Sequence, residues 1–107
     1  TRRFPNTNRT RPGPSSLNVT SKTTDRFRRL FARLPDEVRQ SALKAYSLWQ
    51  EDPSHASLRF KRVLTNPPVY SVRITQAYRA LGVKSNDTIV WFWIGSHDDY
   101  ETVISQL

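Results

Sequence analysis

Residues 70–100 read YSVRITQAYRALGVKSNDTIVWFWIGSHDDY, and most of the predicted sheet lies within them. Apolar and polar residues alternate through 69–74 and 78–83, and the connection between them is very short. This pattern predicts two strands in an antiparallel hairpin. A turn at 84–87 then leads into TIVWFWI (88–94), whose β-branched and aromatic residues predict a strand buried on both faces. Gly95 is expected to end that strand.

Upstream of this stretch, apolar residues recur at helical spacings of three and four. They predict two helices that meet at Pro35, which can end one helix and occupy the first turn of the next. The two apolar stripes are Phe27, Leu30, Phe31 and Leu34, and then Val38, Ala42, Ala45, Tyr46 and Trp49. Residues 23–25 offer N-cap chemistry for the first helix, and Pro53 ends the second.

Residues 58–64 alternate again and predict a further strand, while 17–20 predict a short edge strand and 97–107 a short closing helix. The fold class is therefore α+β. We expect an N-terminal helical hairpin to pack on one face of a twisted antiparallel sheet of about four strands, with the other face open to solvent. Residues 17–107 form one domain in this interpretation. Residues 1–16 hold four arginines and three prolines without periodicity, which predicts a disordered basic arm.

The chain is strongly basic, with 17 Lys and Arg against 9 Asp and Glu and a formal net charge of +8. Such an excess attracts polyanions, chiefly nucleic acid, acidic proteins or anionic membranes. The absence of cysteine excludes disulfides and thiolate metal sites and agrees with a reducing cytoplasm. The longest apolar run, 89–94, is too short to span a bilayer. We expect a cytoplasmic protein with no cofactor and no membrane partner.

Arg73 and Arg79 stand six residues apart across the predicted hairpin loop. If they lie opposite each other, both side chains leave the same sheet face, where two like charges destabilise the ladder unless an anion lies between them. This pair predicts a phosphate site. The alternatives are that both side chains extend into solvent, or that a register slip of one residue separates them.

Arg59 and Lys61, two residues apart on a predicted strand, share a face and add two cations if that face is the open one. An ordinary solvated edge strand explains them equally well. We expect Lys44 and Arg62 to lie elsewhere.

The order of elements, with the segments VRIT (72–75), YRALG (78–82) and GSH (95–97), resembles the RelE/ParE toxin superfamily over roughly residues 18–107. The resemblance implies the toxin of a type II toxin–antitoxin pair, neutralised by a cognate antitoxin that wraps it. RelE-like members cleave messenger RNA, usually on the ribosome, whereas ParE-like members poison DNA gyrase. Fold alone cannot choose between these activities.

Several ribonuclease members of the superfamily carry a general acid near the position of His97, and histidine exchanges protons near neutral pH. A helix cap is the alternative role for His97. Arg79, helped by Arg73, is expected to stabilise the pentacoordinate phosphate through its planar fork of donors. Tyr100 is an RNA contact and the reserve acid in this hypothesis.

Two features count against catalysis. The second-strand region lacks the carboxylate base that some members keep there, and Lys61 can replace it only if its cationic neighbours favour its neutral form. Asp98 and Asp99 also follow His97 directly, where they would repel phosphate. A metal nuclease is disfavoured because Asp98, Asp99 and Glu101 lack further oxygen or histidine ligands at helpful spacing. The leading hypothesis is a metal-independent endoribonuclease that acts on messenger RNA. The alternatives are a gyrase-binding inhibitor and a degenerate module that only binds RNA or protein.

Overall fold

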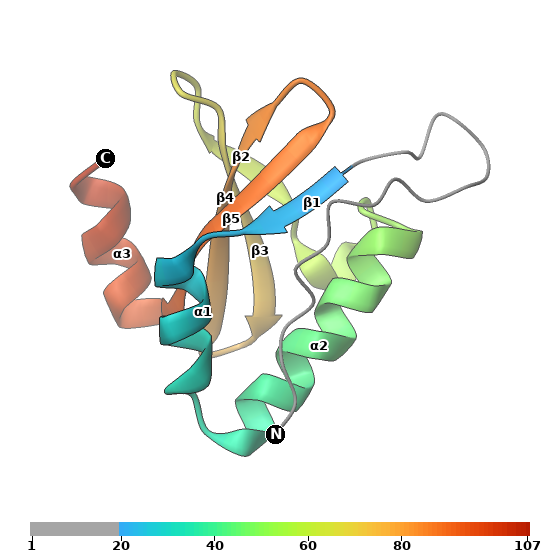
Figure 1. Cartoon of the computed structure of the whole chain (residues 1–107), viewed down its shortest axis with the longest axis vertical. Coiled ribbons are helices and arrows are strands. Elements are labelled where there is room, and N and C mark those ends of the chain that lie inside the picture. The colour runs from blue at the N-terminus through green and yellow to red at the C-terminus, as the bar shows by residue number, and fades with distance from the viewer. Residues whose placement is uncertain (1–19) are drawn as a thin grey trace.

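The computed structural model describes residues 20–107, so the predicted arm at 1–16 and residues 17–19 of the predicted edge strand lie outside it. Its elements are arranged with strands between α2 and α3 (Figure 1). In chain order they are β1 (Thr20–Thr23), α1 (Asp25–Ala32), α2 (Asp36–Glu51), the 3-10 turn η2 (Ala56–Leu58), β2 (Lys61–Leu64), β3 (Val69–Thr75), β4 (Tyr78–Ser85), β5 (Thr88–Ser96) and α3 (His97–Ser105).

The strands form one sheet in the order β1-β5-β4-β3-β2. The antiparallel meander from β2 to β5 confirms the prediction, whereas β1 adds a parallel pairing with β5 and makes the sheet mixed. β1 extends through residues that were expected to cap the first helix. Thr24 alone performs that task, because its side chain accepts a hydrogen bond of 3.0 Å from the Phe27 N–H. The residues before Thr24 are therefore free to pair with β5.

The two apolar helical stripes pack against one face of the sheet, as predicted. Phe27, Phe31, Ala42 and Trp49 are buried there together with Trp91 of β5. Trp49 meets Trp91 edge to face, with ring centroids 5.4 Å apart. Trp93, two residues further along β5, points to the other face. Regular alternation would put both rings on one face, but the β4–β5 register shifts between Leu81 and Gly82, and such a bulge reverses the side-chain direction.

The other sheet face is not open, which corrects the expectation. Tyr100, Val103 and Ile104 of α3 pack against Leu81 and Trp93 on that face. These residues give α3 an apolar side, so the helix covers part of the sheet instead of extending into solvent.

Two strand limits also differ from prediction. β2 begins only at Lys61, because residues 56–58 form a 3-10 turn and Arg59 adopts a left-handed conformation with φ of 46°. β5 continues through Gly95 to Ser96, since Gly95 stays paired with Arg79 in the ladder. No helix within residues 20–107 has the length and apolar character needed to cross a membrane.

Phe31 provides a test of the helical packing. Its side chain is 4% exposed and stacks on Phe27 with ring centroids 6.5 Å apart. Replacing Phe31 with alanine is expected to lower the free energy of unfolding by about 3–5 kcal/mol, because a cavity remains in the core. Urea denaturation measures this loss. Arg29→Ala, on the exposed side of the same helix, is the control and should change stability by less than about 0.5 kcal/mol. If Phe31→Ala lowered the free energy of unfolding as little as Arg29→Ala, the proposed burial of Phe31 would be contradicted.

Candidate functional site

A hollow of about 550 Å³ lies between α3 and the strands β2 and β4. We call it the Arg79 hollow. Its lining combines four cations with one carboxylate, a histidine, a tyrosine and a serine over a small apolar part. The lining residues are Arg59, Lys61, Arg62, Val63, Ser71, Arg79, His97, Tyr100, Glu101 and Ile104. The excess of cations makes the hollow a favourable place for an anion.

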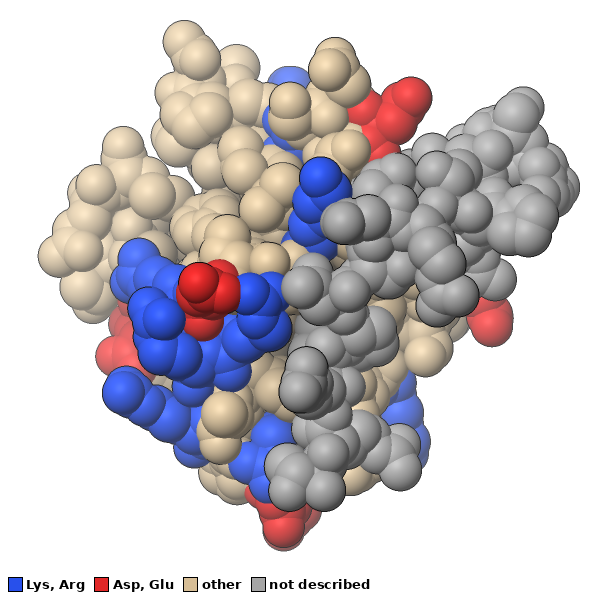
Figure 2. Space-filling model, viewed as in Figure 1, with Lys and Arg blue, Asp and Glu red and all other residues tan. Residues whose placement is uncertain are grey.

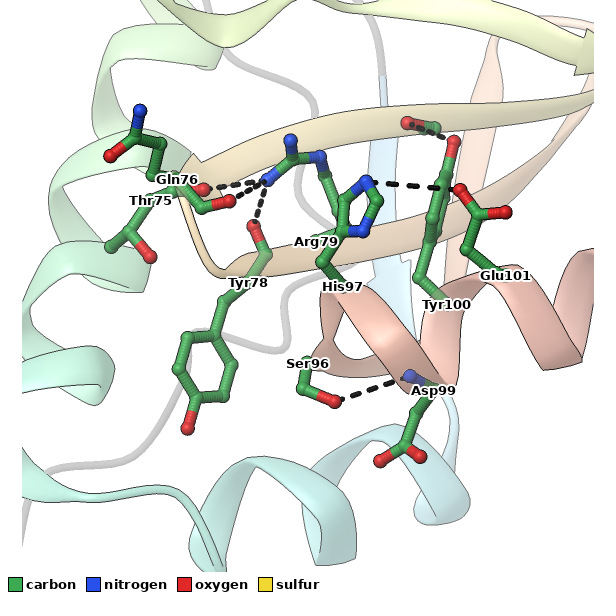
Figure 3. Close-up of polar contacts among 10 residues, drawn as sticks. Thr75, Gln76, Tyr78, Arg79, Ser96, His97, Asp99, Tyr100 and Glu101 are labelled. Carbon is green, nitrogen blue, oxygen red and sulfur yellow. Dashed lines mark hydrogen bonds and ion pairs between the residues drawn. The ribbon is translucent and has the colours of Figure 1, made fainter.

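Arg79 lies on β4 directly opposite Arg73 of β3. Its Nη1 donates hydrogen bonds to three carbonyl oxygens of the β3–β4 turn and of Tyr78, at 2.6 Å for Thr75, 3.2 Å for Gln76 and 3.0 Å for Tyr78 (Figure 3). These bonds fix the plane of the guanidinium. Nε and Nη2 have no acceptor among residues 20–107, so two donor groups of Arg79 are available to a ligand.

The surroundings of Arg79 disfavour its positive charge. Burial lowers the pKa of Arg79, the charges of Arg73 and Arg59 lower it further, and Tyr100 acts in the opposite direction. Arginine still stays protonated at neutral pH. An anion bound beside it would relieve the repulsion between these cations, which is the condition under which two arginines opposed across a ladder are tolerated.

His97 begins α3, immediately after the N-cap Ser96. Its backbone N–H donates to the Ala77 carbonyl at 2.7 Å. The imidazole Nε2 lies 3.9 Å from Oε2 of Glu101, one helical turn further on. Figure 3 shows Glu101 on the same side of α3 as His97, whereas Asp99 lies beside Ser96 on the other side. Asp98 and Asp99 are exposed and do not line the hollow, so neither places its negative charge there.

Tyr100 forms the floor of the Arg79 hollow. It is 8% exposed, and its hydroxyl donates a buried hydrogen bond of 3.2 Å to Oγ of Ser71. Its ring packs beside Trp93, with centroids 6.5 Å apart. Because the hydroxyl is already engaged, the geometry suits a supporting role for Tyr100 better than proton transfer.

Five of the six residues singled out from the sequence therefore line one hollow: Arg59, Lys61, Arg79, His97 and Tyr100. Arg73 lies opposite Arg79 but lines a second hollow together with Lys44. Arg59 reaches the Arg79 hollow from the turn before β2 and not from the strand, which corrects the geometry expected for the Arg59–Lys61 pair.

Two charged lining residues, Arg62 and Glu101, were not predicted. Glu101 stands four residues after His97, a helical spacing that places side chains together and could have revealed it. Arg62 was expected elsewhere because alternation assigned it to the opposite face. The register of β2 shifts between Arg62 and Leu64, and such a bulge bends and twists a strand locally. Within residues 20–107, no three His, Asp or Glu side chains gather into a group able to hold a metal ion.

Gly95 pairs with Arg79 in the β4–β5 ladder and allows the ring of Trp93 to pack closely against the strand. A Cβ at this position would lie 2.7 Å from Cζ2 of Trp93. Gly95→Ala is therefore expected to lower the free energy of unfolding by about 1–3 kcal/mol through overpacking against a buried ring. Thermal unfolding followed by circular dichroism measures the change. An unchanged midpoint would mean that Trp93 can move aside without cost.

A second concentration of positive charge lies over α1 (Figure 2). It contains the exposed side chains of Arg26, Arg29 and Arg33. Arg28 of the same helix pairs with Asp25. This surface increases the long-range attraction of the molecule for polyanions.

Comparisons with known proteins agree with the fold. The ParE-like toxin domain family matches residues 36–102 of the chain. The RelB–RelE antitoxin–toxin complex from Methanococcus jannaschii contains a chain with a TM-score of 0.62 at 16% identity, and the match covers 76% of this chain and 95% of that one. The RelE–RelB complex from Pyrococcus horikoshii OT3 gives 0.60 at 13% identity, covering 73% and 93%. YafQ from E. coli strain BL21(DE3) gives 0.60 at 8% identity, covering 77% and 97%.

None of the curated proteins matches the chain in sequence. The structural matches, at such low identity, establish a likeness of fold. The family match extends over more than half of the chain, and the chain therefore belongs to the ParE-like toxin domain family of the RelE/ParE toxin superfamily.

Proposed function

We propose that this chain is the toxin of a toxin–antitoxin pair and that its Arg79 hollow cleaves messenger RNA without a metal ion, on the ribosome. One observation carries the proposal. The hollow combines two unoccupied guanidinium donor groups of Arg79 with an imidazole and a carboxylate, contributed by His97 and Glu101. A phosphodiester needs these three kinds of group for cleavage by its own 2′-hydroxyl.

In this mechanism the 2′-oxygen forms a bond to phosphorus and the bond from phosphorus to the 5′-oxygen breaks. The Glu101 carboxylate, whose side chain is 69% exposed and able to rotate, takes the proton of the 2′-hydroxyl. Arg79 donates through Nε and Nη2 to the phosphate oxygens as their charge grows. Protonated His97 gives its proton to the departing 5′-oxygen. The products are a 2′,3′-cyclic phosphate and a 5′-hydroxyl.

The cations around this centre hold the RNA. Arg59, Lys61 and Arg62 line the same hollow, and each can neutralise a phosphate of the backbone. Tyr100 and Ser71 support the floor through their buried hydrogen bond.

The partner in this proposal is an acidic antitoxin segment that folds over the basic surface. One of the structurally similar chains comes from a complex named as an antitoxin–toxin complex, and another comes from a RelE–RelB complex. A disordered acidic chain can cover a large surface and match its charge.

Induction of the chain in bacteria tests the proposal. Primer extension on messenger RNA should reveal new 5′ ends within coding regions, while a supercoiling assay with gyrase should remain unaffected. Inhibited supercoiling with intact messenger RNA would favour the gyrase-binding alternative. If neither changes while the purified chain still binds RNA, the degenerate binding module becomes the better hypothesis.

A further inference from the structure

A second hollow, of about 410 Å³, lies where α2 and the η2 turn meet β3. We call it the Lys44 hollow. Its lining is formed by Ser41, Lys44, Ala45, Leu48, Ser57, Leu58, Arg73, Ile74 and Thr75. It shares no lining residue with the Arg79 hollow.

Lys44 and Arg73 give this hollow two cations and its lining contains no carboxylate. Neither side chain forms an ion pair or a hydrogen bond with any of the residues that the structure describes. Arg73 is only half exposed, so its charge is partly removed from water without a protein partner. Partly buried cations are normally paired, and the unpaired state therefore points to an anionic ligand.

The rest of the lining suits the other parts of a nucleotide. Leu48, Leu58 and Ile74 give an apolar surface on which a base or a ribose can lie. The Ser41 hydroxyl stands beside it, with no hydrogen-bond partner among residues 20–107. A nucleotide needs this combination of cations for its phosphate, apolar surface for its base and hydroxyls for its polar edges.

Arg73 connects the two hollows. It lies directly opposite Arg79 in the β3–β4 ladder, and directly opposed residues have Cα atoms about 5 Å apart. A single strand whose phosphate sits at Arg79 can therefore continue over the edge of the hairpin to Arg73 and Lys44.

We propose that the Lys44 hollow is a subsite for a nucleotide adjacent to the scissile phosphodiester. The phosphate of this nucleotide binds Lys44 and Arg73, and its base lies on the apolar surface of the hollow. This inference rests on the proposed RNA cleavage at Arg79. It assigns Lys44 to substrate binding and not to the chemical step.

The test uses the full chain and RNA in which every 2′-hydroxyl is methylated, so that binding is measured without cleavage. Fluorescence anisotropy gives the Kd for a hexanucleotide as a function of salt. Lys44→Ala should weaken binding about fivefold at 0.1 M salt and reduce the salt slope by about 0.7, the value for one phosphate contact of a single strand. Lys22→Ala is the matched control, because Lys22 is an exposed lysine on β1, at the opposite edge of the sheet. It should leave both values near those of the wild type.

Cleavage of an unmodified dinucleotide separates this inference from the proposed function, because its single phosphodiester is the scissile one and leaves no second phosphate for Lys44 and Arg73. Lys44→Ala should cleave it at the wild-type rate. If Lys44→Ala and Lys22→Ala bind the hexanucleotide alike while the wild type cleaves RNA, the subsite is overturned and the proposed function stands. If the wild type binds the hexanucleotide with the predicted Lys44 dependence but cleaves no RNA, the proposed function fails, and the Lys44 hollow is a nucleotide-binding site but not a subsite of a cleavage site. If the wild type does not bind the hexanucleotide, the subsite is overturned.

Discussion

Arg79→Ala is expected to reduce the rate of RNA cleavage by about 10²–10³-fold, the loss typical when one donor to a developing oxyanion is removed. The affinity for RNA should fall only about fivefold, because Arg79 is one phosphate contact among several. Arg79→Lys should restore binding but little of the rate, since an ammonium group keeps the charge and loses the planar fork.

Single-turnover cleavage on translating ribosomes measures the rate, and anisotropy with methylated RNA measures the affinity. Arg62→Ala is the control because Arg62 lines the same hollow and should lose affinity with little change in the bound rate. Urea denaturation of Arg79→Ala shows whether the variant remains folded, because Arg79 donates hydrogen bonds to carbonyls of the β3–β4 turn. If Arg79→Ala and Arg62→Ala have the same effect on the rate, Arg79 contributes charge alone.

His97→Ala should reduce cleavage by about 10²–10⁴-fold, the usual contribution of a general acid or base. Because the mechanism requires His97 in its protonated form, the wild-type rate should fall as the pH rises, and this decline should disappear in His97→Ala. Measuring kcat/KM between pH 5 and 9 tests both expectations. A decline at high pH that persists in His97→Ala would assign the proton donor to another group.

Glu101→Gln distinguishes the proposed base, Glu101, from the proposed acid, His97. It keeps the size of the side chain but removes the carboxylate, so the rise of the rate from acidic pH should disappear while the decline at high pH remains. Asp98→Asn is the matched control, because Asp98 is an exposed carboxylate outside the hollow. A loss of activity shared by both variants would indicate a general effect of negative charge.

Much of the fold follows from local patterns. The helical stripes and the meander after Pro53 were predicted because burial imposes a period on each element. The parallel pairing of β1 with β5 was not predictable in this way, since it joins residues nearly 70 positions apart, such as Ser21 and Ile89. The covering of the second face by α3 depends equally on contacts that are distant in sequence.

The candidate site shows the same division. The short connection between the two strands allowed Arg73 to lie opposite Arg79, and the β3–β4 ladder pairs them, although its register shifts directly afterwards, between Arg73 and Thr75. Arg59 and Arg62 were assigned wrongly because a left-handed turn and a bulge interrupt β2, and neither has a strong signature in the sequence. Glu101 was missed although its spacing from His97 is helical. The family resemblance implies a base on the second strand, whereas the carboxylate that lines the hollow comes from α3.

The chemical ends of the cleaved RNA distinguish attack by its own 2′-hydroxyl from other routes of cleavage. Purified protein is incubated with translating ribosomes, and the ends of the messenger RNA fragments are identified by ligation and by phosphatase treatment. The proposed mechanism predicts 2′,3′-cyclic phosphates and 5′-hydroxyls, absent with Arg79→Ala, because the 2′-hydroxyl of the RNA is the nucleophile. Fragments with 5′-phosphates and 3′-hydroxyls, or an absence of fragments with the wild-type protein, would contradict it.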